Sequence, residues 1–448
     1  MMQNLLDNMN SFNAEVRKQA LIELLNKNHE FTKEGTNVNM HFHSFNSYNS
    51  ENWSPTRIAF ESKQRGLFAA GIIDFDVVDG RDEFLEAAEL LGLRASVGIE
   101  TRAFHTEFSD LEIDSPGEPG VSYIAGAGFV TTLAENSAQA ETLASYHQKA
   151  LERNMALINR INAAISLIAI NYFEDVVPLT PGGNATERHI IQAYIKKSIQ
   201  NFKDKRALMS IWSELLNKSV SEVKMIFQNS ALLEDLVRAK LAKKGGVGYV
   251  QPTMDTFPKM EEFFAWTKSC GAIPLESWLD GTSAGESDPV KLLELSRQKG
   301  ALGLNIIPDR NWNIKDSELK SLKYNKLKEI IAVASSMDMP LHIGTEMNKA
   351  GLPFVDDLDG TFLKPFKNHF LTGAKIFIGH SVLQRFAGFS YAGTEADTTF
   401  KTIKLKNDFF EMVGELPPIT KPIADKLRNA GQSRSLTLIQ EALKLGKW

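Results

Sequence analysis

The first third of the chain alternates short apolar runs with amphipathic stretches. Four apolar runs predict β-strands: VNMHFHS (38–44), AAGIIDFD (69–76), LRASVGIE (93–100) and VSYIAGAGFV (121–130). Apolar residues spaced by three and four positions predict helices over 13–27, 55–65 and 82–91. Strands that alternate with helices are typical of βαβ units, so this part of the chain predicts an α/β fold with a parallel sheet.

The middle of the chain changes to a helical pattern. From about residue 133 the apolar residues recur at helical spacing. The turn PGGN (181–184) is followed by Thr186, a suitable helix N-cap, and by Glu187 in the first turn. Helical patterns then continue to about residue 265. We interpret 184–265 as a helical insertion.

Strand–helix alternation resumes after this insertion. The predicted strands are GAIPLES (271–277), ALGLNII (301–307), MPLHIGTE (339–346) and AKIFIGH (374–380). Two barrel-like stretches that flank one insertion predict a single distorted TIM-like barrel with seven or eight strands. The predicted organisation is an N-terminal helix (1–36), a first barrel part (37–183), the insertion (184–265), a second barrel part (266–400) and a helical C-terminal segment (401–448).

Composition narrows the class of protein. The chain has 448 residues, 43% of them apolar and 23% charged, which is ordinary for a globular protein with a large core. Its single cysteine, Cys270, excludes a disulfide within the chain and a thiolate zinc site. The formal charge of -5 disfavours a nucleic-acid binder that depends on a basic surface.

Targeting and membrane signals are not apparent in the sequence. The first residues are polar and include acids, unlike a secretory signal peptide. The most apolar helical stretch, 158–170, is interrupted by Arg160 and Asn162 and is too short to cross a bilayer. We therefore expect a soluble, cytoplasmic protein without a membrane partner.

The most specific local pattern is His41-Phe42-His43 in the first predicted strand. Alternate residues of a strand point to the same side, so both imidazoles can bind one cation. Neutral imidazole suits zinc, iron, manganese or nickel. Glu100 closes the third predicted strand, and the C-terminal strand ends are where barrels place their chemistry. Two unrelated histidines and a solvated carboxylate are the alternative interpretation.

Other polar residues stand at predicted strand ends. Asp74 and Asp76 alternate in IIDFD, where they can bind a metal, orient the histidines or begin a turn. Glu346 follows the strand that contains His342. His380 stands where a predicted strand gives way to a helix, a place where a lone histidine is more often structural.

Two common catalytic motifs are missing from the sequence. No glycine-rich phosphate loop of Walker or Rossmann type follows a predicted strand. No G-x-S-x-G elbow is present, which disfavours an α/β-hydrolase triad.

Taken together, the segments HFHSFNSYNSENWSP, IDFD, GIE (98–100) and GTEMN (344–348) resemble the PHP family, the polymerase and histidinol phosphatase domains of metal-dependent phosphoesterases. The resemblance covers about 38–350 and is most specific over 41–100. It implies a PHP-type barrel and a first metal site made of His41, His43, Glu100 and Glu346.

The departures from the family pattern concern two further metal sites. The resemblance places Tyr48, Phe75 and Asn348 where the second site has ligands. It places Tyr123, and either Ser277 or Trp278, where the third site has them. The pattern therefore predicts one divalent ion (zinc, manganese or iron) instead of three.

Two functions remain open at this point. The first is a metal-dependent hydrolase, most consistent with a phosphoesterase for a small phosphorylated or anionic substrate. Its candidate catalytic residues are Asp74, Asp76 and Arg102, with Glu276 and Asp280 as weaker additions to the ligand set. The second is a catalytically inactive PHP-like protein that binds a ligand or partner in the barrel mouth.

Overall fold

A computed structural model describes residues 2–448 as a mixed α/β fold. Its centre is one seven-stranded sheet with the strand order β1-β2-β3-β4-β5-β6-β7. The strands are β1 (Val38–Phe42), β2 (Ala69–Phe75), β3 (Arg94–Phe104), β4 (Val121–Ala127), β5 (Ile273–Trp278), β6 (Gly303–Ile306) and β7 (Leu341–Ile343). Each strand that the sequence predicted before residue 350 is present.

The sheet curls into a nearly closed barrel. The backbone N–H of His43 donates to the carbonyl of Glu346 (2.7 Å), and the N–H of Glu346 donates to the carbonyl of His41 (2.8 Å). These two bonds join the end of β1 to the residues that follow β7, so the two edge strands meet. The TIM-like barrel predicted from the sequence is confirmed, with seven strands.

One strand runs against the others. β4 pairs antiparallel with both β3 and β5, whereas the remaining neighbours are parallel. The link from β3 to β4, residues 105–120, holds only one short helical turn, and a parallel neighbour would need a crossover connection. β3 also continues beyond Glu100 to Phe104, because β4 pairs with this extension.

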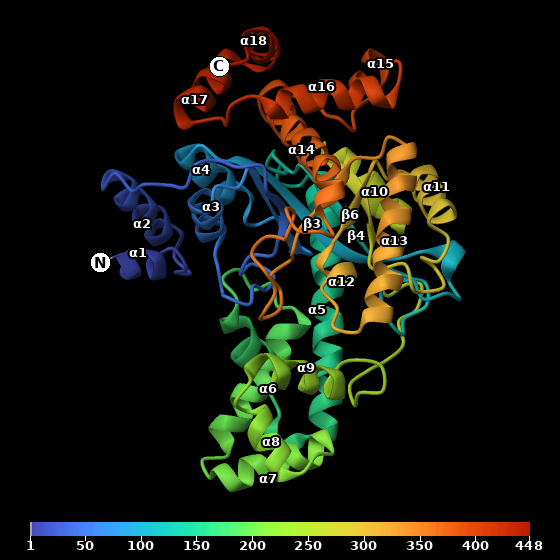
Figure 1. Cartoon of the computed structure of the whole chain (residues 1–448). Helices are drawn as coiled ribbons and strands as arrows, with labels where there is room; N and C mark the ends of the chain where they lie inside the picture. The colour runs from blue at the N-terminus through green and yellow to red at the C-terminus, as the bar shows by residue number, and fades with distance from the viewer. Residues whose placement is uncertain (1) are drawn as a thin grey trace.

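Helices surround the barrel and extend from two ends of it (Figure 1). The helices are α1 (Met2–Asn8), α2 (Ala14–Asn26), α3 (Pro55–Gln64), α4 (Arg81–Leu91), α5 (Ala138–Ala164), α6 (Glu187–Asn201), α7 (Lys205–Leu216), α8 (Val220–Ile226), α9 (Ser230–Leu241), α10 (Met260–Ser269), α11 (Pro289–Lys299), α12 (Asp309–Trp312), α13 (Ser317–Ser336), α14 (Lys367–Ala387), α15 (Thr394–Thr399), α16 (Ile403–Glu415), α17 (Lys421–Ala430) and α18 (Gln432–Leu445). Short helical turns are η1 (Thr106–Phe108), η2 (Ser166–Ile168), η3 (Tyr172–Val176), η4 (Val177–Leu179) and η5 (Lys364–Phe366). Within residues 2–448, none of these helices is long and apolar enough to span a membrane.

The predicted strand at 374–380 is wrong, because AKIFIGH lies inside α14. An apolar run of this length fits a buried strand and a buried helix equally well. Two glycines allow the helix to pack closely on its neighbours. A Cβ at Gly373 would meet the carbonyl oxygen of Leu341 at 1.9 Å, and one at Gly379 would meet that of Phe410 at 1.9 Å.

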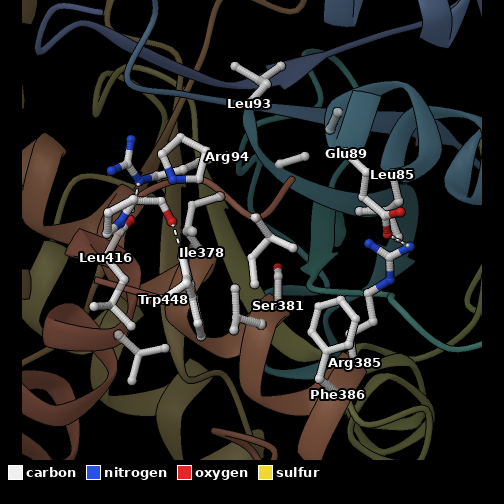
Figure 2. A pocket seen from close by; sticks show the side chains of 17 residues that line it. Leu85, Glu89, Leu93, Arg94, Ile378, Ser381, Arg385, Phe386, Leu416 and Trp448 are labelled. Carbon is white, nitrogen blue, oxygen red and sulfur yellow. Dashed lines mark hydrogen bonds and ion pairs between the residues drawn. The ribbon is translucent and has the colours of Figure 1, made fainter. Parts of the chain in front are cut away.

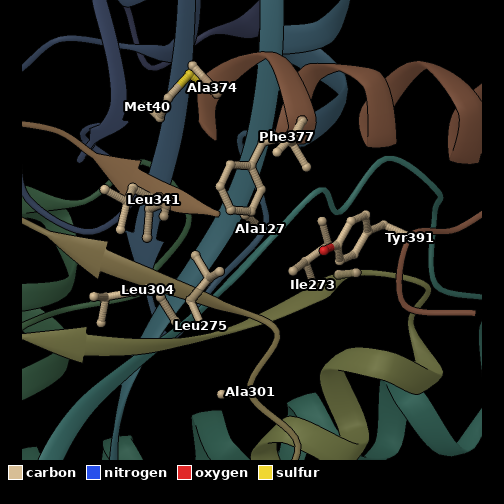
Figure 3. Close-up of a cluster of buried hydrophobic side chains, with 14 of the residues drawn as sticks. Met40, Ala127, Ile273, Leu275, Ala301, Leu304, Leu341, Ala374, Phe377 and Tyr391 are labelled. Atoms are coloured by element: carbon tan, nitrogen blue, oxygen red, sulfur yellow. The ribbon is translucent and has the colours of Figure 1, made fainter. Parts of the chain in front are cut away.

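The main hydrophobic core fills the space between the barrel and α14. Figure 3 shows Phe377 of α14 among side chains from several strands, including Leu275, Leu304 and Leu341. This packing against α14 covers one end of the barrel. Polar side chains can therefore lie at the other end.

A second body of helices stands apart from this core. We use the name helical body for α6–α9, which group together at the end of α5 (Figure 1). The helical body has its own hydrophobic cluster, in which Trp212, Tyr194 and Val237 are fully buried. Hydrogen bonds tie it to the barrel: Asn184 donates to the carbonyls of Asn46 (3.0 Å) and Phe75 (2.9 Å).

Candidate metal centre

Three buried side chains, two from the C-terminal end of β1 and one from within β3, converge inside the barrel. One ligand atom from each of His41, His43 and Glu100 lies within 4.8 Å of the other two. Nε2 of His43 is 3.2 Å from Oε2 of Glu100, and Nε2 of His41 is 3.6 Å from the same oxygen. The alternation of β1 aims both imidazoles into the barrel, and β3 supplies the carboxylate.

Hydrogen bonds set the tautomer of His41. Oδ1 of Asn305 lies 3.1 Å from Nδ1 of His41 and 3.1 Å from Nδ1 of His342. The amide nitrogen of Asn305 donates to the hydroxyl of Ser277 at 3.3 Å. Because an amide oxygen can only accept, both imidazoles donate from Nδ1, and each Nε2 keeps its lone pair.

A different hydrogen bond places the proton of His43 on Nδ1 as well. Its Nδ1 lies 3.0 Å from the hydroxyl of Ser47, and that hydroxyl donates its proton to Oδ1 of Asp74 (2.7 Å). The oxygen of Ser47 therefore accepts from Nδ1 of His43, which leaves Nε2 unprotonated when the imidazole is neutral. Nε2 of His41 and of His43 is buried and has no hydrogen-bond partner within residues 2–448. With neutral imidazoles, two lone pairs thus face a carboxylate, an arrangement that a bound cation would satisfy.

The charges of this cluster are compatible with a bound cation. Burial alone would raise the pKa of Glu100, but the adjacent His41 and His43 hold it well below its usual range. Burial would lower the pKa of His43, but Glu100, with smaller contributions from Glu346 and Asp74, raises it. Glu100 is therefore an anion, and a positive charge is favoured beside it.

Asp74 lies behind the histidines, on the outer side of the barrel wall. Its carboxylate accepts from the backbone N–H of Ser44 (2.7 Å), the hydroxyl of Ser44 (2.6 Å) and the hydroxyl of Ser47. Phe75, not Asp74, is the strand partner of Glu100 and shares its inner face. The structure thus places Asp74 where it orients His43 through Ser47.

Glu346 lies at the mouth beside this cluster and is paired with an arginine. Nη2 of Arg310 donates to both carboxylate oxygens, at 2.7 and 2.6 Å. Burial would raise the pKa of Glu346, but Arg310 lowers it. Glu346 has a φ of +62°, a left-handed conformation that costs free energy in a residue other than glycine and is common at functional sites.

The other two predicted catalytic residues are near but separate. The hydroxyl of Thr101 donates to Oδ1 of Asp76 (2.6 Å), and burial raises the pKa of Asp76. Nη1 of Arg102 donates to Oε2 of Glu118 (3.0 Å), and its guanidinium stacks on Phe257. Neither side chain is part of the cluster around Glu100.

Within the described chain, Phe75, Tyr123, Tyr48 and Asn348 have surroundings without a bound ion's ligands. The rings of Phe75 and Tyr123 lie edge to face with centroids 6.1 Å apart. The hydroxyl of Tyr48 donates to Glu234 of the helical body (3.0 Å), and Asn348 donates to Glu346 (3.2 Å). These are the positions where the PHP resemblance expects additional ligands.

The remaining histidines and acids have structural surroundings. Nδ1 of His380 accepts from the backbone of Tyr391, and its Nε2 lies 3.3 Å from the carbonyl of Gly128. Burial lowers the pKa of His189 to about 4 and that of His342 well below its usual range. Glu276 faces α11, where Ser296 donates to it, and Asp280 pairs with Lys323 (2.6 Å).

Comparisons with known proteins add little at the level of sequence. No protein-family profile matches the chain, and no curated protein matches it significantly. Two solved structures are similar in fold. One is an amidohydrolase from Chromobacterium violaceum with bound sulfate and no metal, at 15% identity and a TM-score of 0.48 over 75% of this chain and 96% of that one. The other is a candidate metal-dependent phosphoesterase from Bifidobacterium adolescentis, at 17% identity and a TM-score of 0.46 over 76% of this chain and 98% of that one.

Three residues of the site were missed by sequence reasoning: Ser47, Asn305 and Arg310. Ser47 lies in the turn that follows β1, where strand alternation gives no signal. Asn305 stands in the apolar run ALGLNII, and a lone polar residue in a predicted inner strand is itself a signal. Arg310 follows that strand in a polar segment and carried no signal of its own.

A cavity of ≈ 40 Å³ elsewhere in the molecule is unrelated to this centre. Figure 2 shows it between α4, α14 and the C-terminal Trp448, with Arg385 paired to Glu89 on one wall. Its lining includes Leu93 and Arg94 at the start of β3, the opposite end of the strand from Glu100. The cavity has room for one or two water molecules only.

Proposed function

We propose that this chain is a metal-dependent hydrolase that binds one divalent ion through His41, His43 and Glu100. The observation that carries the proposal is the pair of buried, unpartnered Nε2 lone pairs facing the Glu100 carboxylate. Two imidazoles and a carboxylate suit zinc, manganese or iron, and three protein ligands leave positions for water and substrate. A bound ion of this kind lowers the pKa of water and polarises a phosphoryl or carbonyl oxygen.

The surrounding residues hold the ligands and prepare the mouth for an anion. Asp74 orients His43 through Ser47, and Asn305 orients His41. Arg310, whose side chain is 38% exposed, presents a guanidinium next to the cluster while Glu346 fixes its position. Planar guanidinium groups match the oxygens of phosphate and carboxylate. A small phosphorylated substrate is therefore the class that we propose.

One ion per chain is the stoichiometry that we propose. Phe75 and Tyr123 present an apolar ring and a phenol, and the hydroxyl of Tyr48 is bonded to Glu234. Burial, together with Glu234, raises the pKa of Tyr48 well above its usual range, so its phenolate is not formed near neutral pH. Without a second ion, the charge on a transferring phosphoryl group must be balanced by arginine, which gives Arg310 its proposed role.

The test combines metal analysis with turnover. Protein dialysed against metal-free buffer should retain close to one divalent ion per chain by plasma mass spectrometry. Phosphomonoesters, phosphodiesters and lactones are then screened with zinc, manganese and iron. Glu100→Gln should lower metal affinity and turnover by more than about 100-fold, because even the outer partners of metal ligands contribute 10–100-fold.

Glu276→Gln is the matched control, since it changes the same buried residue type in the same barrel and should keep metal and turnover. A folded protein that retains its ion but turns over none of these substrates would favour the alternative, a binding protein with a PHP-like mouth. Two or three ions per chain would contradict the single-ion proposal.

A further inference from the structure

A group of basic side chains lies where the helical body meets the barrel. We call Arg102, Arg153, Arg238 and Lys243 the cationic cluster. They come from β3, α5, α9 and the turn after α9, so only the tertiary fold brings them together. Arg102, Arg238 and Lys243 have side chains that are 20%, 25% and 40% exposed, which makes them accessible to a ligand.

Shared partners define the geometry of the cationic cluster. The guanidinium groups of Arg102 and Arg153 lie over the same ring, that of Phe257, at 4.4 and 4.7 Å from its centroid. Arg238 and Lys243 both bind the carboxylate of Glu187, and Nζ of Lys243 is 3.0 Å from Oε1. The cationic cluster is therefore two pairs of cations, one on an aromatic ring and one on a carboxylate.

The charges in this cluster do not balance. Three of the four cations, Arg102, Arg238 and Lys243, share two carboxylates, Glu118 and Glu187. Within residues 2–448, Arg153 has no carboxylate within ion-pair distance and donates only to the carbonyl of Thr256 (3.1 Å).

Burial and the neighbouring Arg102 lower the pKa of Arg153 to about 10, although Asp76 opposes the shift. Burial would raise the pKa of Glu187, but Arg238, Lys243 and Arg102 lower it to about 2. These cations repel one another, and a further anion would relieve that repulsion.

The cationic cluster is close to the proposed metal centre. Arg102 is two residues beyond Glu100 on the same face of β3, a rise of about 7 Å. Tyr123 is the strand partner of Arg102 on β4. Its phenol is influenced by Arg102 and Arg238 and by Glu100. A short substrate held at Glu100 would therefore extend naturally to the cluster.

We propose that the cationic cluster binds a second anionic group of the substrate, a carboxylate or a phosphate, while the reacting ester lies at His41, His43 and Glu100. This inference rests on the proposed function, because that proposal says which end of the substrate reacts. The second subsite itself depends only on the cluster, and it can be measured as binding with or without metal.

The experiment uses three matched probes: butyl phosphate, 4-(phosphooxy)butanoate and butane-1,4-diol bisphosphate. Calorimetric titrations of the full chain, with manganese and with a chelator, measure the affinity of each. The second anionic group should tighten binding by about tenfold or more, as expected for charge-assisted hydrogen bonds. The relative gain of the carboxylate and the bisphosphate shows which anion the subsite prefers.

Arg153→Met should remove most of that gain and leave the affinity for butyl phosphate almost unchanged. Arg160→Met is the matched control, because Arg160 lies on the same helix and donates to a loop carbonyl, that of Gly248 (2.7 Å), outside the cluster. Lys243→Met provides a second test in the cluster, with thermal melts to verify folding.

The outcomes separate the two proposals. Equal binding of all three probes, or an equal loss of the gain in Arg160→Met, would overturn the second subsite and leave the hydrolase proposal intact. A gain that depends on Arg153 in a protein that hydrolyses no ester would support the second subsite and refute the hydrolase.

Discussion

Two glutamates on the barrel, Glu100 on β3 and Glu276 on β5, are similarly buried but lie in opposite electrostatic surroundings. Glu100 faces the barrel interior, where His41 and His43 hold its pKa well below the usual range. Glu276 faces the outer layer against α11, and burial raises its pKa to about 8 although Ser296 donates to it. Burial therefore does not decide the charge of these acids; the neighbours on each face do. On the inner face, the carboxyl group of Glu100 keeps its negative charge although it is buried, as a metal ligand must. On the outer face, the charged form of Glu276 is disfavoured.

The largest expected effect is that of removing one imidazole beside Glu100. His41→Ala should lower metal affinity by more than about 100-fold, because it removes a ligand and leaves Glu100 without part of its compensating charge. Metal content after dialysis is the measurement. His369→Ala, at an exposed position of α14, is the control. Metal content that survives His41→Ala would mean that the inner face binds no ion through these histidines.

The second effect concerns the residue behind the inner face. Asp74→Asn should weaken metal binding by roughly 10–100-fold, since Ser47 would lose the acceptor that orients it toward His43. Competitive chelator titration measures the change. Asp79→Asn is the control, because Asp79 is an exposed acid of the same loop. An affinity equal to that of the wild type would show that Asp74 supports the loop and not the ligand.

A third test addresses the positive charge at the mouth. Arg310→Met should raise the KM for an anionic substrate by about tenfold and change kcat less if its main role is binding. Steady-state kinetics on the best substrate of the screen provide both constants, and Arg434→Met, on the exposed surface, is the control. A fall in kcat with an unchanged KM would instead assign Arg310 to the transition state.

The smallest expected effect concerns Glu276, the glutamate on the outer face of the barrel. The folded-state pKa of Glu276, about 8, is above its unfolded value, so the folded protein retains a proton that the unfolded chain releases. The free energy of unfolding should therefore fall as the pH rises from about 4.5 to about 8. Glu276→Gln should remove this slope and be roughly 1–3 kcal/mol more stable than the wild type at pH 8, with little difference near pH 4.5.

Urea denaturation at several pH values measures that difference, and Glu294→Gln on the exposed side of α11 is the control. A wild-type slope that persists in Glu276→Gln would assign the proton to another group, such as Glu286, whose pKa burial raises to about 7.

The error at 374–380 shows where local patterns fail. AKIFIGH is apolar enough for a strand, but α14 needs its apolar residues to cover β7 and to meet α16. The small side of the helix at Gly373 and Gly379 permits these contacts. A choice between helix and strand in such a run depends on which surface remains to be covered, and no window of sequence contains that information.

The sequence by itself predicted the barrel class and the convergence of His41, His43 and Glu100, from local periodicity together with the resemblance to the PHP family. Alternation along β1 sets the direction of both imidazoles, and Glu100 reaches them from β3, two strands away in the sheet. The tertiary structure alone decided which residues complete the centre. Asn305, Arg310 and the cationic cluster reach their positions only when the barrel closes and the helical body packs against its mouth. Residues hundreds of positions apart become neighbours by this closure, and their pairing leaves no periodic trace in the chain.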